Sequence, residues 1–323
     1  MKVGIIGAGS IAGTMAGTIR EMDCAQNYAV AARDYGRAAE FAQTYGFEKA
    51  YGSYEELVED AGVELVYIAT PHSHHYEHIK LCLNHGKHVL CEKSFTVNES
   101  QAREVLALAR EKKLLLTEAI WTRYMPMRKT LDSVLSSGVI GRPYMLTANL
   151  GYIISGKERI MRPELAGGAL LDVGIYPLNF ASMVFGDEVD SITGTAVMTE
   201  TGVDAQNSIT ITYKDGKMAA LCSSAMGLSD RRGIIYGDNG FIEVENINNC
   251  EGIRVYDRSR NMIASYDTPK QISGYEYEVE SCLRAIKEGA LECPEMPHEE
   301  TLRMMGWMDE LRRQWGLVYP MER

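Results

Sequence analysis

The sequence lacks paired cysteines and any obvious export signal. Its seven cysteines are scattered over 323 residues, and none forms a Cys-x-x-Cys pair. Free thiols in a reducing compartment are the simplest interpretation of this pattern. The N-terminus is short and glycine-rich and does not resemble a signal peptide, and no run looks long and apolar enough to span a bilayer. We therefore expect a cytoplasmic protein that does not enter a membrane.

The sequence also lacks a basic block. The formal net charge is −11, and the acidic excess is spread along the chain. This balance argues against nucleic acid or an anionic membrane as the main partner. Hydrophobic residues make up 46% and charged residues 24%, which is typical of a globular protein. Because 323 residues exceed one ordinary core, we expect two domains.

Residues 1–120 alternate between apolar strands and helical patterns, which predicts a doubly wound parallel sheet of the α/β class. A capping-box-like spacing of Asn98 and Gln101 marks one helix start. The predicted strands are Lys2–Ile6, Tyr28–Ala32, Leu65–Ala69, His88–Cys91 and Leu114–Leu116, and the predicted helices are Ile11–Met22, Arg37–Tyr45, Tyr76–Leu83 and Asn98–Lys112.

Residues 121–323 have a different texture and form the predicted second domain. Its strands alternate apolar and polar residues, which favours antiparallel pairing with one solvated face. The predicted strands are Ser208–Tyr213, Met218–Ser223, Gly233–Tyr236, Phe241–Val244 and Ile253–Tyr256, and the predicted helices are Met127–Ser137, Tyr275–Glu288 and Glu299–Trp315.

A glycine loop follows the first strand and opens a helix. In Gly7-Ala8-Gly9-Ser10-Ile11-Ala12, the first glycine permits a tight turn and the second lets the backbone approach a pyrophosphate. Ala12 takes the third glycine position. The strand-loop-helix context predicts a dinucleotide site, and a plain tight turn is the alternative.

The end of the second strand bears on cofactor choice. Arg33 follows it directly, and Arg37 comes one helical turn later. Two guanidinium groups suit a 2′-phosphate, so we expect NADP to be preferred. Asp34 keeps NAD possible, since NAD sites place an acidic residue here, and both arginines could instead be solvated.

Two stretches carry the candidate chemistry. Gly86–Lys93 reads as a buried strand that delivers Glu92 and Lys93 at its carboxyl end, where ligands of parallel sheets bind. In Gly167–Pro177, Asp172 and Tyr176 are four residues apart and share a side of a helix or strand. A nearby ammonium such as that of Lys93 would lower the pKa of Tyr176, and Asp172 would orient Lys93 or a substrate hydroxyl. The alternative is a packed core tyrosine.

A histidine cluster follows the third strand, which ends at Thr70-Pro71. His74 and His78 have helical metal-pair spacing, but no further ligands complete a zinc site, so we expect none. We place His72 and His75 near the cofactor, with His75 nearest the nicotinamide.

Trp121, Arg123 and Tyr124 begin the second domain. Aromatic faces and a guanidinium suit polyols, so these residues are candidates for a sugar or diol pocket. An interdomain hinge packed by an aromatic side chain is the alternative.

These motifs together resemble the Gfo/Idh/MocA oxidoreductases. Residues Glu118–Tyr124 are similar to the branch that contains dimeric dihydrodiol dehydrogenase and NADP-dependent D-xylose dehydrogenase. The resemblance implies an N-terminal Rossmann domain and a C-terminal α/β domain with a large open, mainly antiparallel sheet, often used for dimerisation. It implies that Tyr176 is the proton donor or acceptor and that Lys93 occupies the Glu-Lys-Pro position. Ser94 stands where the family has proline, and we expect the serine to relax the turn after Lys93.

The expected protein is an NADP-dependent oxidoreductase, with NAD possible, acting on a hydroxyl or carbonyl carbon of a small sugar or cyclic diol. The alternatives are a non-catalytic NAD(P)-binding regulator or sensor, and an inositol-dehydrogenase-like or biliverdin-reductase-like enzyme. The sequence leaves the substrate and the reaction direction open, and we expect the pocket loops around Gly151 to Arg162 and Gly227 to Arg232 to decide the substrate. The candidate catalytic residues are Lys93, Tyr176 and Asp172, and the candidate cofactor-binding residues are Gly7, Gly9, Ser10, Ile11, Ala12, Arg33, Arg37, Thr70, Pro71, His72, His75, Glu92 and Lys93.

Overall fold

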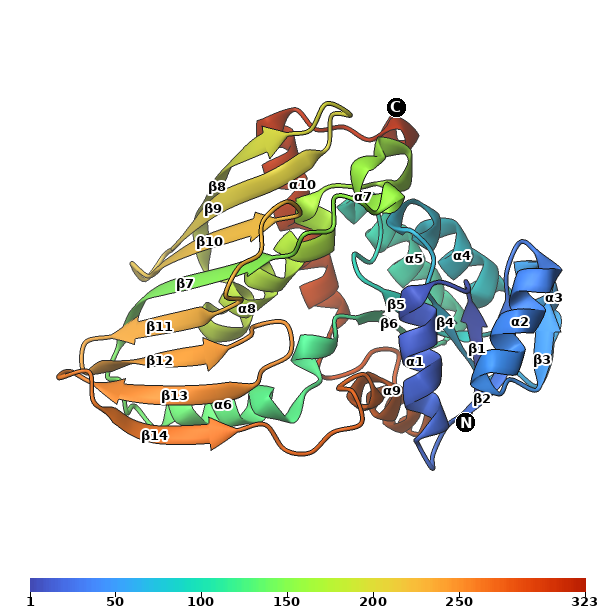
Figure 1. Cartoon of the computed structure of the whole chain (residues 1–323), viewed down its shortest axis with the longest axis horizontal. Helices are drawn as coiled ribbons and strands as arrows, with labels where there is room; N and C mark the ends of the chain where they lie inside the picture. The colour runs from blue at the N-terminus through green and yellow to red at the C-terminus, as the bar shows by residue number, and fades with distance from the viewer. The chain divides into compact units, whose positions relative to one another are not determined.

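A computed structural model describes all 323 residues as two compact units (Figure 1). Unit 1 contains Met1–Tyr124 and Gln271–Met305, and unit 2 contains Met125–Lys270 and Gly306–Arg323. The predicted second domain ran from residue 121 to the end of the chain. The structure differs, because residues 271–305 pack as part of unit 1.

Unit 1 is built on a six-stranded parallel sheet in the order β3-β2-β1-β4-β5-β6. This arrangement confirms the predicted doubly wound sheet. Its strands are β1 (Lys2–Ile6), β2 (Gln26–Ala31), β3 (Lys49–Tyr51), β4 (Leu65–Ile68), β5 (His88–Glu92) and β6 (Leu116–Ala119). Its helices are α1 (Ser10–Arg20), α2 (Tyr35–Tyr45), α3 (Tyr54–Glu59), α4 (His72–Asn84), α5 (Glu99–Lys112), the short η1 (Trp121–Arg123), α9 (Glu276–Glu288) and the first part of α10 (His298–Trp315).

The central strands of unit 1 are buried on both faces. All four residues of β4 are buried, as are four of the five in β1 and in β5. Such strands read as continuous apolar runs, which is why the sequence located them. Because the strands are parallel, their carboxyl ends meet at one edge of the sheet, where the glycine loop, Thr70 and Lys93 lie.

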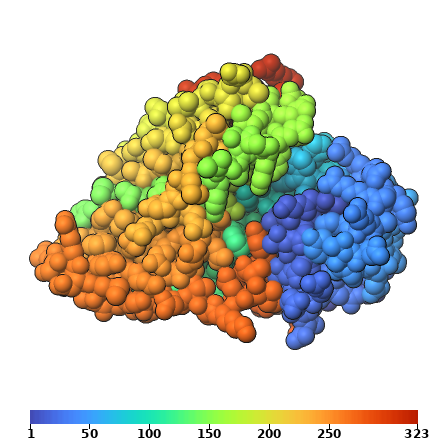
Figure 2. Space-filling model, in the orientation of Figure 1, coloured from blue at the N-terminus to red at the C-terminus, as the bar shows by residue number.

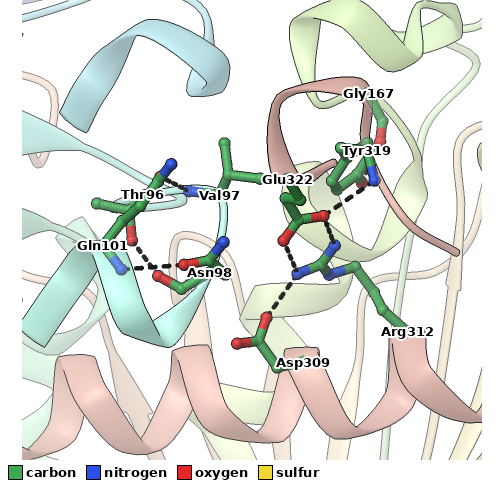
Figure 3. A network of polar contacts seen from close by, with 9 residues as sticks. All are labelled: Thr96, Val97, Asn98, Gln101, Gly167, Asp309, Arg312, Tyr319 and Glu322. Carbon is green, nitrogen blue, oxygen red and sulfur yellow. Dashed lines mark hydrogen bonds and ion pairs between the residues drawn. The ribbon is translucent and has the colours of Figure 1, made fainter. Parts of the chain in front are cut away.

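Polar caps set the helix starts in unit 1. The Asn98 side chain accepts a hydrogen bond from the Gln101 backbone N–H at 2.9 Å, which confirms Asn98 as the N-cap of α5 (Figure 3). The Gln101 side chain accepts from the backbone N–H of Val97 at 3.2 Å, one residue before the cap. The loop after β5 therefore enters α5 through a fixed turn.

The predicted position of the last strand of this sheet was wrong by a few residues. β6 spans Leu116–Ala119, whereas Leu114–Leu116 was predicted. Lys113 ends α5 in the left-handed conformation, and the next two residues are still leaving the helix. The backbone of Leu116 donates to the Leu291 carbonyl, and the His298 ring bonds to the Leu116 carbonyl, so the 271–305 segment pairs with this strand.

Unit 2 is built on an eight-stranded sheet in the order β14-β13-β12-β11-β7-β10-β9-β8. Only the β7–β10 pair is parallel, so the sheet is mixed and mostly antiparallel, as expected. Its strands are β7 (Pro143–Gly151), β8 (Val189–Met198), β9 (Asp204–Tyr213), β10 (Met218–Ser224), β11 (Gly233–Gly237), β12 (Gly240–Glu245), β13 (Gly252–Asp257) and β14 (Met262–Asp267).

Helices of unit 2 cover one face of this sheet (Figure 1). Residues alternate between buried and exposed along β9 and β10, as the period-2 pattern predicted. The strands β11 to β14, orange in Figure 2, belong to the visible surface. The helical elements are α6 (Pro126–Ser136), α7 (Glu158–Met161), η2 (Pro163–Leu165), the π-helical turn η3 (Leu170–Gly174), α8 (Ile175–Phe185), the remainder of α10 and η4 (Pro320–Glu322).

One apolar run corrects an expectation about membranes. No segment was expected to be able to span a bilayer, yet Pro163–Phe185 is long and apolar enough to do so by length and composition. In the structure, 89% of its apolar window is buried inside the protein. The run is therefore the core helix of unit 2, whose apolar surface is covered by its own fold.

Candidate cofactor-binding and catalytic residues

The glycine loop has the geometry of a phosphate cradle. Gly7 has φ +104°, and a Cβ there would lie 2.9 Å from the Ala69 carbonyl oxygen, so only glycine fits. Gly9 is the N-cap of α1 and has no side-chain cap, and a Cβ there would meet open space. Ser10 opens α1, and Ala12 is buried against the sheet. Exposed N–H groups at this helix start therefore fit a pyrophosphate.

A further glycine, Gly13, escaped the sequence analysis. A Cβ at this position would lie 2.4 Å from the Tyr45 hydroxyl of α2. This close approach of α1 to α2 is the packing role that the motif assigns to its third glycine. In this chain the close-packing role falls to Gly13, one residue after the motif position, which is occupied by Ala12.

Two arginines, Arg33 and Arg37, follow the end of β2, and the Asp34 side chain between them caps the next helix. Asp34 caps α2 by accepting the Arg37 backbone N–H at 2.8 Å, so its carboxylate is engaged by the helix start. Arg37 donates from its guanidinium to the Ala8 carbonyl at 3.0 Å, which ties α2 to the glycine loop. Arg33 is exposed. Burial is the main cause of the lowered pKa of His74 and His78, and the charge of Arg33 lowers both a little further. The positive charge gathered here fits a 2′-phosphate.

Replacement of Arg33 tests this assignment. We expect Arg33→Ala to weaken NADPH binding by about tenfold or more, because a charge-assisted contact contributes roughly 1.5–3 kcal/mol. NADH affinity should stay nearly unchanged. Arg37→Ala should weaken both nucleotides, since Arg37 also holds the Ala8 carbonyl. Fluorescence titration measures both affinities, and Arg20→Ala, at the exposed end of α1, is the control. Equal losses for NADPH and NADH in Arg33→Ala would contradict a phosphate contact.

The end of β4 is organised by two histidines of α4. Pro71 is the N-cap position of this helix, and the Thr70 hydroxyl bonds to the His78 ring at 3.0 Å. The His75 ring is fully buried, with one nitrogen 2.8 Å from the Thr70 carbonyl oxygen and the other 2.8 Å from that of Ser94. Burial lowers the pKa of His75 to about 4, so the neutral ring donates to one carbonyl at a time. His75 therefore links the ends of β4 and β5, and its place beside the nicotinamide stays a prediction.

The other histidines belong to this packing as well. His72 is nearly buried, and the His74 ring bonds to the Ser73 hydroxyl at 2.9 Å. Burial lowers the pKa of His78 to about 4. No group of three or more His, Cys, Asp or Glu side chains in the protein could hold a metal ion.

The loop that carries Lys93 is fixed on both sides. The Glu92 carboxylate accepts a hydrogen bond from the buried Tyr67 hydroxyl and, at 3.2 Å, from the Lys93 backbone N–H. After Ser94, the Phe95 backbone N–H donates to Glu118 at 3.1 Å. The Lys93–Ser94 peptide bond is cis. Glu92, a predicted cofactor contact, therefore also holds the backbone of this loop. The backbone around Lys93 is fixed by these contacts although the family's proline is replaced by Ser94.

No structural role was predicted for Tyr67 or Glu118. Tyr67 lies in β4, which reads as an apolar run, and Glu118 lies in β6, beyond the end of the strand predicted at Leu114–Leu116. Burial raises the pKa of Glu118 to about 7, because the charged carboxylate is poorly solvated there. The sequence feature that could have revealed Glu118 is a single glutamate among buried residues, because a glutamate is seldom fully buried unless it has a partner.

The predicted catalytic pair of unit 2 stands at a helix start. Asp172 lies in η3, and Tyr176 is the second residue of α8, so the two share a helical side as expected. Tyr176 is 7% exposed. Asp172 accepts from the Arg159 guanidinium at 2.7 Å. Arg159 is a partner that the sequence analysis did not name, and it lies in the loop predicted to shape the pocket.

The predicted substrate residues of unit 1 are built into its fold. The Trp121 ring stacks on Tyr275, with ring centroids 4.1 Å apart. Arg123 is 8% exposed and forms an ion pair with Glu300. The Tyr124 hydroxyl donates to the Glu118 carbonyl at 2.9 Å. These contacts give all three residues structural partners within unit 1, and their substrate role stays a prediction.

The two loops expected to decide specificity meet in unit 2. The Ser229 hydroxyl accepts from the Gly151 backbone N–H at 2.8 Å, and the Ser229 N–H donates to the Gly151 carbonyl at 3.2 Å. Both residues line a cavity of about 380 Å³ on β7 to β10, together with Gln206 and Cys222. Asp172 and Tyr176 are not among its lining residues.

Comparison with known sequences agrees with this geometry. Residues 1–120 match the family described as "Oxidoreductase family, NAD-binding Rossmann fold", and residues 129–243 match the "GFO/IDH/MocA C-terminal domain". The trans-1,2-dihydrobenzene-1,2-diol dehydrogenase of Xenopus tropicalis is 34% identical over 327 residues, covering 99% of each chain. The human enzyme of the same name is 34% identical over 332 residues and covers 100% of this chain and 99% of its own.

Solved structures share the fold at lower sequence identity. A 3-ketoreductase from Actinomadura kijaniata, in complex with NADP and TDP-benzene, aligns with TM-score 0.89 and 24% identity over 97% of each chain. The aldose-aldose oxidoreductase from Caulobacter crescentus, complexed with glycerol, aligns with TM-score 0.87 and 18% identity over 97% of each chain. At these identities the likeness establishes the fold alone.

Proposed function

We propose a function on the premise that this chain belongs to the Gfo/Idh/MocA oxidoreductase family. The protein is an NAD(P)-binding, small-molecule dehydrogenase acting on CH–OH groups. We propose that its substrate is a small sugar or cyclic diol and that NADP is its cofactor. The observation that carries the proposal is the phosphate cradle of unit 1, with arginines at the end of β2 and Lys93 at the end of β5 of the same sheet.

The cofactor would be held by residues already in place. The N–H groups at the start of α1, beyond Gly7 and Gly9, suit the pyrophosphate, and Arg33 and Arg37 suit the 2′-phosphate. Asp34 caps α2 through Oδ1, and the two arginines beside it support NADP over NAD. When bound, the nicotinamide ring supplies the acceptor or donor of the hydride.

Side chains of this protein transfer the proton of the substrate hydroxyl. We propose that Tyr176 takes the proton of the substrate hydroxyl in oxidation and returns it in reduction. The Lys93 ammonium stabilises the phenolate of Tyr176 and the developing alkoxide, because fixed positive charge favours both anions. The ion pair between Asp172 and Arg159 supports the turn from which Tyr176 projects.

The substrate class rests on the relatives. Those 34% identical to this chain are named for a dihydrobenzene diol, and one structural neighbour is named for aldoses. Vicinal hydroxyls on a small ring are common to both classes. A cyclic diol or an aldose is therefore the substrate that we propose.

A substrate panel tests the proposal. Trans-1,2-dihydrobenzene-1,2-diol, D-xylose, other aldoses and inositol are each incubated with NADP and with NAD, and reduced nucleotide is measured by absorbance. We expect turnover with a diol or an aldose and NADP. Binding of NADPH without turnover of any compound would favour a regulator or sensor of the same fold.

We also propose that the protein forms a homodimer or higher homo-oligomer through the sheet of unit 2. The support is its exposed apolar side chains on several strands: Tyr144, Val197, Met218, Met262 and Tyr266. A face of this kind is commonly covered by another protein surface. Sedimentation at micromolar concentration should give a dimer or a larger species, and a monomer would contradict the proposal.

A reducing location, such as the cytoplasm, is proposed as well. All seven cysteines are free thiols in the structure. This state suits a compartment in which thiols stay reduced.

A further inference from the structure

The turn that leads into the Tyr176 helix is anchored from outside at several points. Residues 167–174 connect η2 to α8 and include η3, which contacts β7, β9 and β10. The backbone N–H of Gly168 donates to the Ile160 carbonyl of α7 at 2.8 Å. A Cβ at Gly167 would lie 2.5 Å from that same carbonyl oxygen, so the backbone approaches α7 closely.

The first anchor is Asp204, at the start of β9. Its side chain is fully buried, and Oδ2 accepts from the Leu170 backbone N–H at 2.8 Å. Gly168 has φ +111°, and a Cβ there would lie 2.2 Å from Oδ1 of Asp204. The carboxylate therefore fills the space that a side chain at Gly168 would take, and it bonds the first residue of η3.

Asp204 is itself held by Asn207 of the same strand, which in turn is held from β10. The Asn207 side chain donates to Asp204 Oδ2 at 2.9 Å. The Ser223 hydroxyl of β10 donates to the Asn207 side chain at 2.9 Å. A Cβ at Gly174 would lie 3.0 Å from that hydroxyl, so this chain of contacts reaches both ends of η3.

The second anchor is the C-terminal tail (Figure 3). The fully buried Tyr319 donates its hydroxyl to the Gly167 carbonyl at 2.6 Å. Arg312 of α10 lies over the Tyr319 ring, 4.9 Å from its centroid, and donates to Glu322 at 2.7 Å and to Asp309 at 2.6 Å. Glu322 also accepts from the Tyr319 backbone N–H at 2.9 Å, which locks the tail onto α10.

We propose that Asp204 and Tyr319 are positioning residues that set the place of Tyr176 by fixing residues 167–170. The proposal rests on the role given to Tyr176 above. An error of about 1 Å in a reacting group can cost roughly 100-fold in rate. Neither anchor belongs to unit 1, so the nucleotide site should be unaffected by their loss.

Three variants test the anchors, with a matched control. Tyr319→Phe removes only the hydroxyl bond, and Asp204→Ala removes the acceptor for Leu170. Asp204→Asn keeps an oxygen for Leu170 and should restore most of the function. Tyr213→Phe is the control, because Tyr213 is buried in the same unit and its hydroxyl has no partner.

Amide hydrogen exchange and kinetics are measured on each folded variant. We expect faster exchange within residues 167–176 in Tyr319→Phe and Asp204→Ala, without substrate. We also expect kcat to fall about 10- to 100-fold with NADP and the best substrate of the panel. NADPH affinity and the control should match the wild type.

Two results would overturn the inference. One is unchanged exchange at 167–176 in both variants, and the other is faster exchange with unchanged kcat. If Asp204→Ala does not fold, Tyr319→Phe carries the test. Failure of the proposed function looks different, because Tyr176→Phe would then keep wild-type turnover or the wild type would turn over nothing. The exchange result stands in either case.

Discussion

Replacing Tyr176 by phenylalanine should lower turnover by about 10²–10⁴-fold, the usual effect of removing a general acid or base. Phenylalanine keeps the ring that fills this mostly buried position and removes only the hydroxyl. The fold of unit 2 and the nucleotide site of unit 1 should therefore persist. Initial rates with NADP and the best substrate measure the change, and NADPH fluorescence measures cofactor binding.

The Tyr213→Phe variant separates this effect from a general loss of buried hydroxyls. Tyr213 is buried in the same unit and its hydroxyl has no hydrogen-bond partner, so its loss should change neither rate nor affinity. A folded Tyr176→Phe protein with wild-type turnover would remove Tyr176 from the mechanism.

Lys93→Met should produce a loss of the same order, about 10²–10⁴-fold in turnover. Methionine keeps the unbranched shape and most of the length of the side chain, and it removes the charge that stabilises the phenolate and the alkoxide. The surrounding loop should survive, because Glu92, Glu118 and His75 hold its backbone through contacts that the Lys93 side chain does not make. Lys112→Met, at the exposed end of α5, is the control for loss of a lysine in unit 1.

A double variant tests whether Lys93 and Tyr176 act together. If Lys93 acts through Tyr176, then Lys93→Met with Tyr176→Phe should be little worse than the poorer single variant, because residues that act as a unit are not additive. Fully multiplicative losses would show that the two residues act independently.

Local patterns were sufficient to predict the parallel sheet and the glycine loop. A strand buried on both faces is a continuous apolar run, and a glycine with positive φ next to Ala69 leaves the sequence no other residue at position 7. The cap at Asn98 was also predictable from a local pattern, because it depends on two residues that are three positions apart. The assignment of unit 2 as mostly antiparallel followed from alternation along β9 and β10.

Contacts between distant residues were not predictable. Asp204 and Tyr319 lie far along the chain from residues 167–170, and nothing local marks either as their partner. The pairing of Leu116 with Leu291 and His298 draws residues 271–305 into unit 1 by the same kind of long-range contact. Arg123 looked suited to a polyol because its partner Glu300 is 177 positions away. The parallel pairing of β7 with β10 likewise depends on tertiary packing.

The central proposal is that the protein transfers a hydride between NADP and a carbinol carbon of a small diol or sugar. Its most direct test uses the best compound of the panel with deuterium on the reacting carbon, and mass spectrometry of the nucleotide product. The account predicts NADPH that carries one deuterium, formed by the wild type and nearly absent with Tyr176→Phe. Unlabelled nucleotide, or no reduced nucleotide with any diol or aldose, would contradict it.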